Sequence, residues 1–347
     1  MIYSERCRGQ ESWGVYQLAG QSAMIGRDEN RCQILLSDRN VSKQHAEIGC
    51  IGGRYRIRDL QSFNGTFVNG VEVKGWTGLH DKDVIMICGV RLIYTNGTVV
   101  YSRERHGGVR AEIDIKRKQV PDRNRRFHKV SLLENIRMVI EPGEFVTILG
   151  GSGAGKSTLL GCINGFERAG VEGHVLINGI DLYQNYNKLK LIMGYVPQSD
   201  ADLPAELTVY EHIRATAGLR MPGEKKEQIS ERVDKVIHDL MLFPKKNELI
   251  GKLSGGEKRR VSIAMELAAD PMMIFMDEAT SGLDPSSETE VMNISRRIAH
   301  EQNKIVLMIT HNTKNFALCD KVIVLCKMNQ VGRLAFFGTP DEALRRC

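Results

Sequence analysis

The stretch EFVTILGGSGAGKSTLLGCI at residues 144–163 decides the fold of most of the chain. It begins with an apolar run of strand length, passes through a glycine-rich turn and continues as a helix-forming sequence. The turn GGSGAGKST at 150–158 matches the pattern G-x-x-x-x-G-K-[ST], in which backbone N–H groups wrap phosphate groups. A strand, such a turn and a helix together predict an α/β domain with a largely parallel sheet, whose ligands lie beyond the carboxyl ends of the strands.

Two side chains in this turn have the chemistry to hold a nucleotide. Lys156 supplies a positive charge for the β- and γ-phosphates, and Ser157 offers its hydroxyl to Mg²⁺. The N-terminus of the following helix adds the positive end of its dipole. A glycine-rich turn without a ligand is the disfavoured alternative. We therefore predict a nucleotide site formed by Gly151, Ser152, Gly153, Ala154, Gly155, Lys156, Ser157 and Thr158.

Two adjacent carboxylates end another apolar strand, MIFMDE at 273–278. Asp277 is the candidate for holding Mg²⁺ through water, and Glu278 for orienting the attacking water. The motif alone is weak, but the phosphate-binding turn makes the functional interpretation the stronger one. Gln198 in GYVPQSD and His311 in MITHN also end apolar stretches, where each taken separately is more often a polar strand terminus than a catalytic residue.

The two parts of the chain have different patterns. Residues 1–100 contain short β-rich segments separated by Gly, Asn and Asp, which is typical of an all-β sandwich. The polar, charged segment at 101–111 predicts a linker. From residue 112 to residue 347 strands alternate with helical stretches, and EQISERVDKVIHDL at 227–240 places its apolar residues on one helical face. We therefore predict a multidomain chain, with a β-sandwich followed by an α/β domain.

Composition and charge narrow the class of protein. The 347 residues suffice for two domains, and no apolar run reaches the ~18–20 residues of a membrane span. The N-terminus has no signal-peptide core. Eight cysteines without metal-ligand spacing disfavour zinc and a disulfide framework and fit a reducing cytosol.

The net charge of +6 is mild, and the basic run at 116–129 lacks interleaved aromatic residues, so we expect a solvated hairpin and no nucleic acid. Attraction of this run to anionic lipid headgroups is a minor alternative.

Six motifs in chain order resemble the nucleotide-binding domain of ABC transporters: GGSGAGKST, YVPQ, LSGGE, MIFMDE, SGLD and ITH. The resemblance covers about 112–347 and implies an ATPase of the P-loop fold that uses ATP and Mg²⁺, with a helical subdomain at about 199–265. It implies that Gln198 senses Mg²⁺ and reports to the transport domain. It implies also that His311 contacts the γ-phosphate and that Asp284 lies in the loop that joins two sites.

The segment KLSGGEKRR at 252–260 implies a second copy of the domain. Ser-Gly-Gly at the start of a helix is a place to hold a phosphate. In the ABC family this helix caps the γ-phosphate of the opposite subunit's ATP, so Ser254, Gly255 and Gly256 are expected to act on a neighbour's nucleotide. The chain has one set of these residues. We therefore expect a second ABC ATPase domain as partner, most simply in a head-to-tail homodimer.

Three longer segments are similar to the G subfamily of ABC exporters, whose ATPase domain precedes its membrane domain: 207–222, 255–284 and 332–344. This similarity implies a membrane-spanning transport domain, fused or separate, and a location on the cytoplasmic side of the cell membrane. Ala279 stands where the family usually has Pro, which we expect to matter little. The loop that normally carries an adenine-stacking aromatic is interrupted by VPDRNRR; Phe127 or His128 is the candidate for stacking, and Val120 is the alternative occupant of that position.

The segment MIGRDENRCQILLSDRNVSKQHAEI at 24–48, with DLQSFNGTFVNG at 59–70, resembles a forkhead-associated (FHA) domain, a phosphothreonine-binding β-sandwich, over about 12–96. A phosphate dianion attracts the guanidinium of Arg27, the hydroxyl of Ser42 and the ammonium of Lys43. The resemblance implies that Asn64 holds the peptide backbone.

Two further residues of this module bear on its function. The resemblance implies that His45 braces the loop rather than touching phosphate, while Phe63 replaces the Ser or Thr usual before the Asn. A purely structural module remains the alternative to phosphothreonine binding.

The sequence as a whole predicts the ATP-hydrolysing subunit or domain of an ABC exporter with an FHA module for phosphothreonine-dependent regulation or recruitment. A phosphothreonine protein and a Ser/Thr kinase are the implied partners. One alternative is a soluble ABC ATPase that regulates a macromolecular complex, which the single ATPase domain disfavours. Another is a phosphopeptide scaffold with a vestigial ATPase, which the presence of Lys156, Asp277, Glu278 and His311 disfavours.

Overall fold

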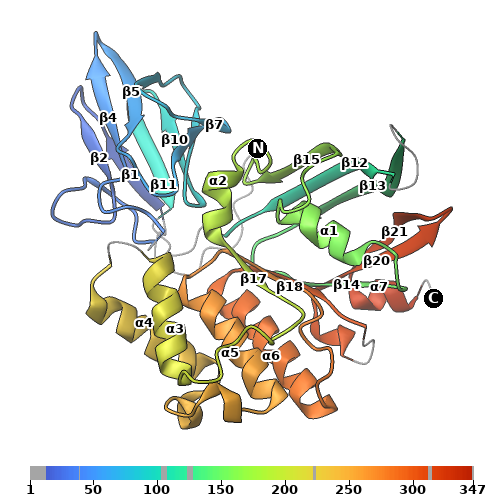
Figure 1. Cartoon of the computed structure of the whole chain (residues 1–347). Coiled ribbons are helices and arrows are strands. Elements are labelled where there is room, and N and C mark those ends of the chain that lie inside the picture. Colours follow the sequence, from blue (N-terminus) through green and yellow to red (C-terminus); the bar gives the residue numbers. More distant parts are fainter. Residues whose placement is uncertain are drawn as a thin grey trace. The chain divides into compact units, whose positions relative to one another are not determined.

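The computed structural model describes residues 13–38, 40–102, 108–122, 128–221, 224–311 and 315–345 (Figure 1). The chain forms two compact units, and the main boundary between them lies at Gly108. The first unit consists of short strands, and the described helices belong to the second. The change of pattern along the sequence therefore corresponds to a change from an all-β to an α/β architecture.

The first unit is a β-sandwich of two sheets. Its strands pair antiparallel, apart from the parallel pair of β2 and β3. The six-stranded sheet has the order β1 (Trp13–Gln17), β11 (Thr98–Ser102), β10 (Val90–Thr95), β9 (Val84–Ile87), β6 (Thr66–Val68) and β7 (Val71–Glu72). The five-stranded sheet has the order β3 (Ile34–Leu35), β2 (Ala23–Gly26), β4 (Ala46–Ile51), β5 (Arg54–Asp59) and β8 (Thr77–Gly78).

The period-2 alternation of strands explains the core of this unit. Ile48 of β4 lies opposite Ile57 of β5, and both side chains are fully buried among the inward-facing residues of the two sheets. Asn96 and Gly97 close the β10–β11 hairpin with positive φ angles of 45° and 76°, which Asn and Gly adopt at low cost. The alternating apolar positions and the Asn-Gly turns thus specify the sandwich locally.

The second unit is built on one ten-stranded sheet. Its parallel half contains β20 (Lys321–Met328), β14 (Phe145–Gly150), β19 (Ile305–Ile309), β18 (Met273–Met276) and β17 (Met193–Val196), in that order. The other half continues from β20 through β21 (Val331–Gly338), β13 (Lys129–Ile140), β12 (Ala111–Pro121), β15 (Val171–Ile177) and β16 (Ile180–Asp181). The sheet is therefore mixed, because the pairs β20–β21, β12–β13 and β12–β15 are antiparallel, and the expectation of a largely parallel sheet holds only for the half that begins with β20.

Seven helices are described in this unit, and three of them pack on one another as α3, α4 and α5 (Figure 1). The apolar face predicted on α4 is buried there, with Val233, Val236 and Ile237 in the core. The helices are α1 (Lys156–Ile163), α2 (Tyr186–Leu189), α3 (Val209–Arg220), α4 (Lys226–Asp239), α5 (Gly255–Ala268), α6 (Pro285–Gln302) and α7 (Pro340–Leu344). Short 3₁₀ turns lie at η1 (Lys190–Ile192), η2 (Phe243–Lys245), η3 (Ile250–Lys252) and η4 (Phe316–Leu318).

Three of these helices begin at a sequence pattern of the form [ST]-x-x-E. The segments T-x-x-E at 208–211, S-x-x-E at 254–257 and T-x-x-E at 339–342 each form a capping box, in which the hydroxyl and the carboxylate satisfy backbone N–H groups of the first turn. The helices that they open are α3, α5 and α7. Among the described residues, no helix has both the length and the apolar composition required to cross a lipid bilayer.

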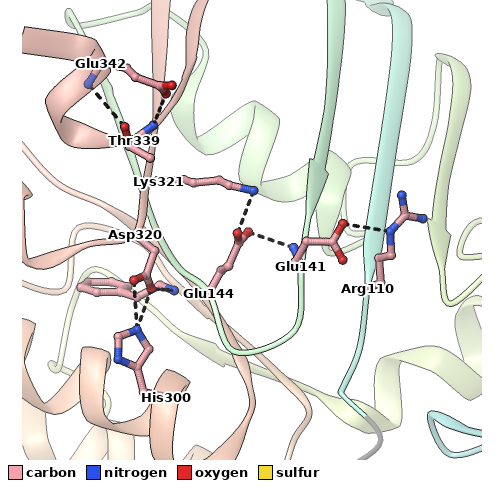
Figure 2. Close-up of polar contacts among 9 residues, drawn as sticks. Arg110, Glu141, Glu144, His300, Asp320, Lys321, Thr339 and Glu342 are labelled. Carbon is pink, nitrogen blue, oxygen red and sulfur yellow. Dashed lines mark hydrogen bonds and ion pairs between the residues drawn. The ribbon is translucent and has the colours of Figure 1, made fainter. Parts of the chain in front are cut away.

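Polar contacts close the amino end of the parallel strands (Figure 2). The carboxylate of Asp320 accepts a hydrogen bond from the backbone N–H of Phe145 at 2.8 Å and lies 2.9 Å from Nε2 of His300. Lys321 forms an ion pair with Glu144 at 2.7 Å. These contacts tie the starts of β14 and β20 to the end of α6, so the opposite, carboxyl end of the strands is the one that carries the glycine-rich turn.

We predict that Ile57→Ala destabilises the first unit by about 2–5 kcal/mol, because it opens a cavity in a closed sandwich core. Val71→Ala is the matched control, because that side chain is 71% exposed, and its effect should stay within about 0.5 kcal/mol. Urea unfolding followed by tryptophan fluorescence measures this difference, since both tryptophans, Trp13 and Trp76, belong to the first unit. Equal unfolding midpoints for the two variants would contradict this account of the core.

A second prediction concerns the cap of α5. The backbone N–H of Ser254 donates to the Glu257 carboxylate at 2.8 Å, and this bond is the main cause that lowers the pKa of Glu257. A carboxylate whose pKa falls on folding stabilises the protein above its unfolded pKa of about 4.3, and the stabilisation is lost as the pH falls through the folded pKa. Glu257→Gln should therefore unfold at a lower temperature than the wild type at neutral pH, and the difference should shrink below about pH 4.3.

Circular dichroism at helical wavelengths measures this effect, because the described helices belong to the second unit. Glu231→Gln is the control, since Glu231 is exposed on α4. A difference between wild type and Glu257→Gln that stays constant down to acid pH would show that the charge of Glu257 plays no part.

Candidate functional site

The glycine-rich turn joins β14, which ends at Gly150, to α1, which begins at Lys156. Gly155 caps α1 with a φ of 93°, and a Cβ at this position would come within 2.7 Å of the Leu133 side chain. The Lys156 side chain is buried, and its Nζ donates to the carbonyl oxygens of Gly150 at 3.0 Å and Gly151 at 3.2 Å. The ammonium group therefore lies across the concave side of the turn, where backbone N–H groups and the α1 N-terminus attract phosphate.

The structure brings together two of the three residues predicted at the Mg²⁺ site, Ser157 and Asp277; the third, Gln198, contacts Glu278. The hydroxyl of Ser157, at the start of α1, donates to Asp277 Oδ1 at 3.3 Å, although 120 residues separate them. Burial raises the pKa of Asp277, the Ser157 hydrogen bond opposes this, and the nearby charge of Glu278 adds to it. A hydroxyl and a carboxylate at this separation are the hard oxygen donors that Mg²⁺ uses beside substrate phosphates.

Tyr195 is a member of the site that the sequence analysis missed. Its hydroxyl donates to Asp277 Oδ2 at 3.4 Å, and burial, together with the carboxylate, raises the pKa of Tyr195. The signal was present in the motif YVPQ, because β17 lies beside β18 and their parallel register places Tyr195 opposite Phe275, two residues before Asp277. The contact between Tyr195 and Asp277 can be predicted only if the pairing of β17 with β18 is known.

The three predicted catalytic residues meet at the ends of neighbouring strands. The Glu278 carboxylate accepts a hydrogen bond from Gln198 Nε2 at 2.7 Å, and its other oxygen lies 2.8 Å from His311 Nε2. Gln198 follows β17, Glu278 follows β18 and His311 follows β19, three consecutive strands of the parallel half. Parallel strands end at the same edge of the sheet, which explains why residues so far apart in sequence converge.

Glu278 also has a strained backbone. Its φ is 47°, in the left-handed region that residues other than Gly, Asn and Asp seldom adopt. Such a conformation costs on the order of 1–3 kcal/mol and persists where surrounding structure fixes it, often at functional sites. Here it turns the carboxylate toward Gln198 and His311 directly after a buried strand.

Ser254, Gly255 and Gly256 of the LSGGE motif, called the signature residues below, lie at the N-terminus of α5. The Oγ of Ser254 accepts from the Glu257 N–H at 3.3 Å, and the side chain of Ser254 is exposed, as is Gly255. Gly256 is buried, and a Cβ there would approach Ser287 Oγ to 2.7 Å. Gly256 is therefore also needed for the close packing of α5 against the start of α6, in addition to any contact with phosphate.

Asp284 has a local task that the sequence did not predict. Its carboxylate caps α6 by accepting from the N–H groups of Ser286 and Ser287 at 3.0 Å each, and from Ser287 Oγ at 2.6 Å. The Ser287 hydroxyl is the main cause that lowers the pKa of Asp284, followed by the backbone N–H groups. The helix cap fixes the orientation of the loop that carries Asp284, whose role at a second site remains a prediction.

Two candidates for the adenine-stacking position, Val120 and His128, lie at the β12–β13 hairpin. Val120 pairs with Val130, and His128 is exposed and accepts a backbone hydrogen bond from Asp122 at 2.8 Å. Phe127 lies outside the described residues. Stacking by one of these three side chains stays a prediction.

In the first unit, one short segment gathers the predicted phosphothreonine residues. Arg27 Nε donates to Val41 O at 2.8 Å, and Asn64 Nδ2 donates to Asn40 O at 2.8 Å. Ser42 is the residue after Val41, and its Oγ accepts a hydrogen bond from the N–H of Phe63 at 3.1 Å. Residues 40–42 therefore connect the loop after β2 with the loop between β5 and β6, so that Arg27, Ser42 and Asn64 share one end of the sandwich.

Two buried side chains shape this end. His45 is fully buried, where its Nδ1 accepts from the Ser42 N–H at 3.0 Å and its Nε2 lies 3.1 Å from Gly65 O, contacts that brace both loops. Asn64 is 7% exposed, and its Oδ1 is buried without a hydrogen-bond partner among the described residues. A buried amide oxygen without a partner is uncommon in folded proteins, and this one belongs to the loop to which the resemblance assigns peptide binding. Lys43 is exposed beside them.

Asp59 supports the Asn64 loop and was not anticipated from the sequence. Its carboxylate accepts from Ser62 Oγ at 2.6 Å and from Thr66 Oγ1 at 2.7 Å. Burial opposes ionisation, but these hydroxyl groups outweigh it and lower the pKa of Asp59. The loop that presents Phe63 and Asn64 is thus anchored at both ends by one carboxylate.

Comparison with known proteins agrees with this geometry. A profile of the ABC transporter family matches residues 133–281, and a profile of the FHA domain matches residues 23–88. An ABC transporter ATP-binding/permease protein of Mycobacterium tuberculosis is 33% identical over 333 residues, which cover 94% of this chain and 36% of that protein. Mouse ATP-binding cassette sub-family G member 5 is 35% identical over 222 residues, covering 61% of this chain and 33% of that protein. The chain thus spans about a third of the length of these relatives.

A solved structure supports the fold of the second unit. CbiO1 from Clostridium perfringens, part of the ABC transporter complex cbiONQ, aligns with a TM-score of 0.59 and 28% identity over 68% of this chain and 90% of that one. ABC transporter ATP-binding domains of this kind are ATPases. The chain therefore joins an FHA domain to an ATP-binding domain of the ABC transporter family, and its second unit is an ATPase domain.

Proposed function

We propose that this chain powers a G-subfamily-like ABC exporter by hydrolysing ATP in a head-to-tail dimer, under the control of phosphothreonine binding at its FHA domain. The observation that carries the proposal is the Glu278 carboxylate, which is fixed between Gln198 and His311 at the carboxyl edge of the parallel strands. Three groups from three strand ends, set beside a phosphate-binding turn, form a site for phosphoryl transfer to water.

The donor set fits ATP with Mg²⁺. Ser157 and Asp277 supply oxygen ligands, Gln198 supplies an amide oxygen, and Lys156 supplies the charge for phosphate. A bound Mg²⁺ would neutralise charge on the β- and γ-phosphates. The chain's own contribution is positional: the turn holds the phosphates, Glu278 orients a water, and His311 presents its imidazole to the same place.

The dimer follows from the position of the signature residues. Ser254 and Gly255 are exposed at the N-terminus of a 14-residue helix, a natural anion site, but the contacts of Ser254 stay within its own helix cap. In this family such a helix end completes the ATP site of an opposite domain. Two copies related head to tail would give each ATP one phosphate turn and one signature helix.

Transport and location rest on the relatives. The Mycobacterium protein is named as an ATP-binding/permease protein, and the mouse protein as a member of sub-family G. We infer that this chain acts at the cytoplasmic side of a membrane with a membrane-spanning domain, fused or separate, which converts the ATP cycle into export.

The FHA domain would bind a threonine-phosphorylated segment made by a Ser/Thr kinase. Arg27 and Ser42 offer charge and hydroxyl to the phosphate, and the unpaired Oδ1 of Asn64 offers an acceptor to the peptide backbone. This binding would recruit the ATPase or gate it.

Replacement of the catalytic carboxylate is the first test of the ATPase proposal. Glu278→Gln should reduce phosphate release by about 100-fold or more, because general-base contributions are typically 10²–10⁴ in rate. The same variant should accumulate as a dimer with MgATP, since closure precedes hydrolysis. Phosphate release and light scattering measure the two effects, with the exposed Glu231→Gln as control. A Glu278→Gln chain that never dimerises with ATP, even beside its membrane partner, would contradict the dimer.

A second test addresses the FHA domain. Arg27→Ala should weaken phosphothreonine-peptide binding by about 10–100-fold, because a hydrogen bond to a charged group contributes about 1.5–3 kcal/mol. Arg31→Ala is the matched control, since Arg31 has a side chain that is 69% exposed and a distant ion pair with Asp28 at 3.9 Å. Titration calorimetry with phosphorylated and unphosphorylated peptides measures the binding. Equal affinity for both peptide forms would contradict phosphothreonine recognition, and no binding of either form would favour a purely structural module.

A further inference from the structure

One face of the signature helix α5 is hydrogen-bonded to the segment that carries Gln198. The residues of this face are Arg259, Ser262 and Glu266, which share it because they are three and four positions apart. Their partners lie in residues 195–200, at the end of β17 and in the loop that follows. We call this set of contacts the α5–loop clamp.

Arg259 is the centre of the clamp. Its guanidinium donates to the carbonyl oxygens of Pro197 at 2.5 Å and Gln198 at 2.6 Å, and it forms an ion pair with Asp200 at 3.2 Å. The side chain is 3% exposed, and burial lowers the pKa of Arg259 although Asp200 opposes this. A cation this deeply buried is tolerated only when its hydrogen-bond partners are held in place, so loop and helix restrain each other.

Two further contacts extend the clamp along the helix. Ser262 Oγ donates to Asp200 Oδ1 at 2.7 Å. Glu266 Oε2 accepts from the backbone N–H of Tyr195 at 3.1 Å and also pairs with Arg220 of α3. The segment is therefore held to α5 at its start, middle and end.

The clamped segment also reaches the chain's own nucleotide site. Tyr195 hydrogen-bonds Asp277 at 3.4 Å, and Gln198 hydrogen-bonds Glu278 at 2.7 Å. At the N-terminal end of α5, Ser254 lies five residues before Arg259, about 7.5 Å along the helix axis. A continuous set of hydrogen bonds thus leads from the carboxylates of one ATP site to the helix end that would cap the other.

We propose that Arg259 is a positioning residue that couples the two ATP sites of the dimer, by making α5 and the Gln198 loop move as one body. The proposal rests on the proposed head-to-tail dimer. A shift of Gln198 when ATP binds in its own site then moves Ser254 of the same chain relative to the neighbour's ATP. Coupling of this kind needs a rigid physical connection between the sites, which the clamp supplies.

The test compares two adjacent arginines in the full chain. Arg259→Met removes the hydrogen bonds to the loop but keeps a long side chain, and Arg259→Lys keeps the charge but loses the two-pronged contact. Arg260→Met is the matched control, because Arg260 is also partly buried but pairs with Glu290 of α6. The measurements are the ATPase rate as a function of ATP concentration, the affinity for a fluorescent ATP analogue, and the thermal midpoint.

For Arg259→Met we expect the Hill coefficient to fall from near 2, its limit for two sites, toward about 1. We expect kcat to fall about tenfold or more while the analogue's affinity stays within about twofold, since the lost contact acts after binding. Arg259→Lys should lie between this variant and the wild type, and Arg260→Met should keep the wild-type cooperativity. If Arg259→Met does not fold, the Hill coefficient of Arg259→Lys is compared with that of Arg260→Met, and a lower value for Arg259→Lys is the expected result.

Wild-type cooperativity in both Arg259 variants would overturn the proposal, and so would an equal loss in Arg260→Met, which would assign the effect to the helix and not to the clamp. A wild-type chain with a Hill coefficient of 1 and no ATP-dependent dimer would contradict the proposed dimer itself, and with it the coupling. The first two results leave the proposed function intact, so the two failures are distinguishable.

Discussion

The proposed activity of the second unit depends on the position of one carboxylate, that of Glu278. Glu278 has to leave a fully buried strand and present its oxygens to Gln198 and His311, and it does so in a left-handed backbone conformation. This works only if three neighbouring parallel strands end at one edge, beside the turn that begins α1. The sheet order, the buried strands and the capped helix ends all serve this convergence.

Local sequence motifs predict much of this arrangement. The contacts that the sequence analysis missed join residues that are far apart in the chain. The P-loop motif predicted the α/β fold, and six motifs in chain order predicted the family; the comparisons confirm both. The contacts of Tyr195 with Asp277 and of Arg259 with Gln198 span 82 and 61 residues, and no local pattern indicates them. The basic run predicted a solvated hairpin at 116–129, where β12 and β13 meet, but it did not indicate that β12 also pairs antiparallel with β15 and so adds to the main sheet.

In the first unit too, the motifs predicted the type of domain but not the contacts between its loops. Its motifs predicted an FHA domain, and the family profile confirms it. The hydrogen bonds that let residues 40–42 join Arg27 to Asn64 depend on loop geometry, as does the anchoring of that loop by Asp59. Side-chain networks between loops depend on the tertiary fold, so sequence motifs identify such residues without showing what holds them.

The claim that each ATP site is shared between two copies has a direct test by mixing two variants. Lys156→Ala disables the phosphate turn, and Ser254→Asp keeps the helix cap but sets a negative charge against the neighbour's phosphate. A mixed dimer then contains one site with an intact Lys156 from one chain and an intact Ser254 from the other. We predict that the mixture hydrolyses ATP faster than the summed rates of the two separate variants. A mixture that shows only the sum would contradict a shared site.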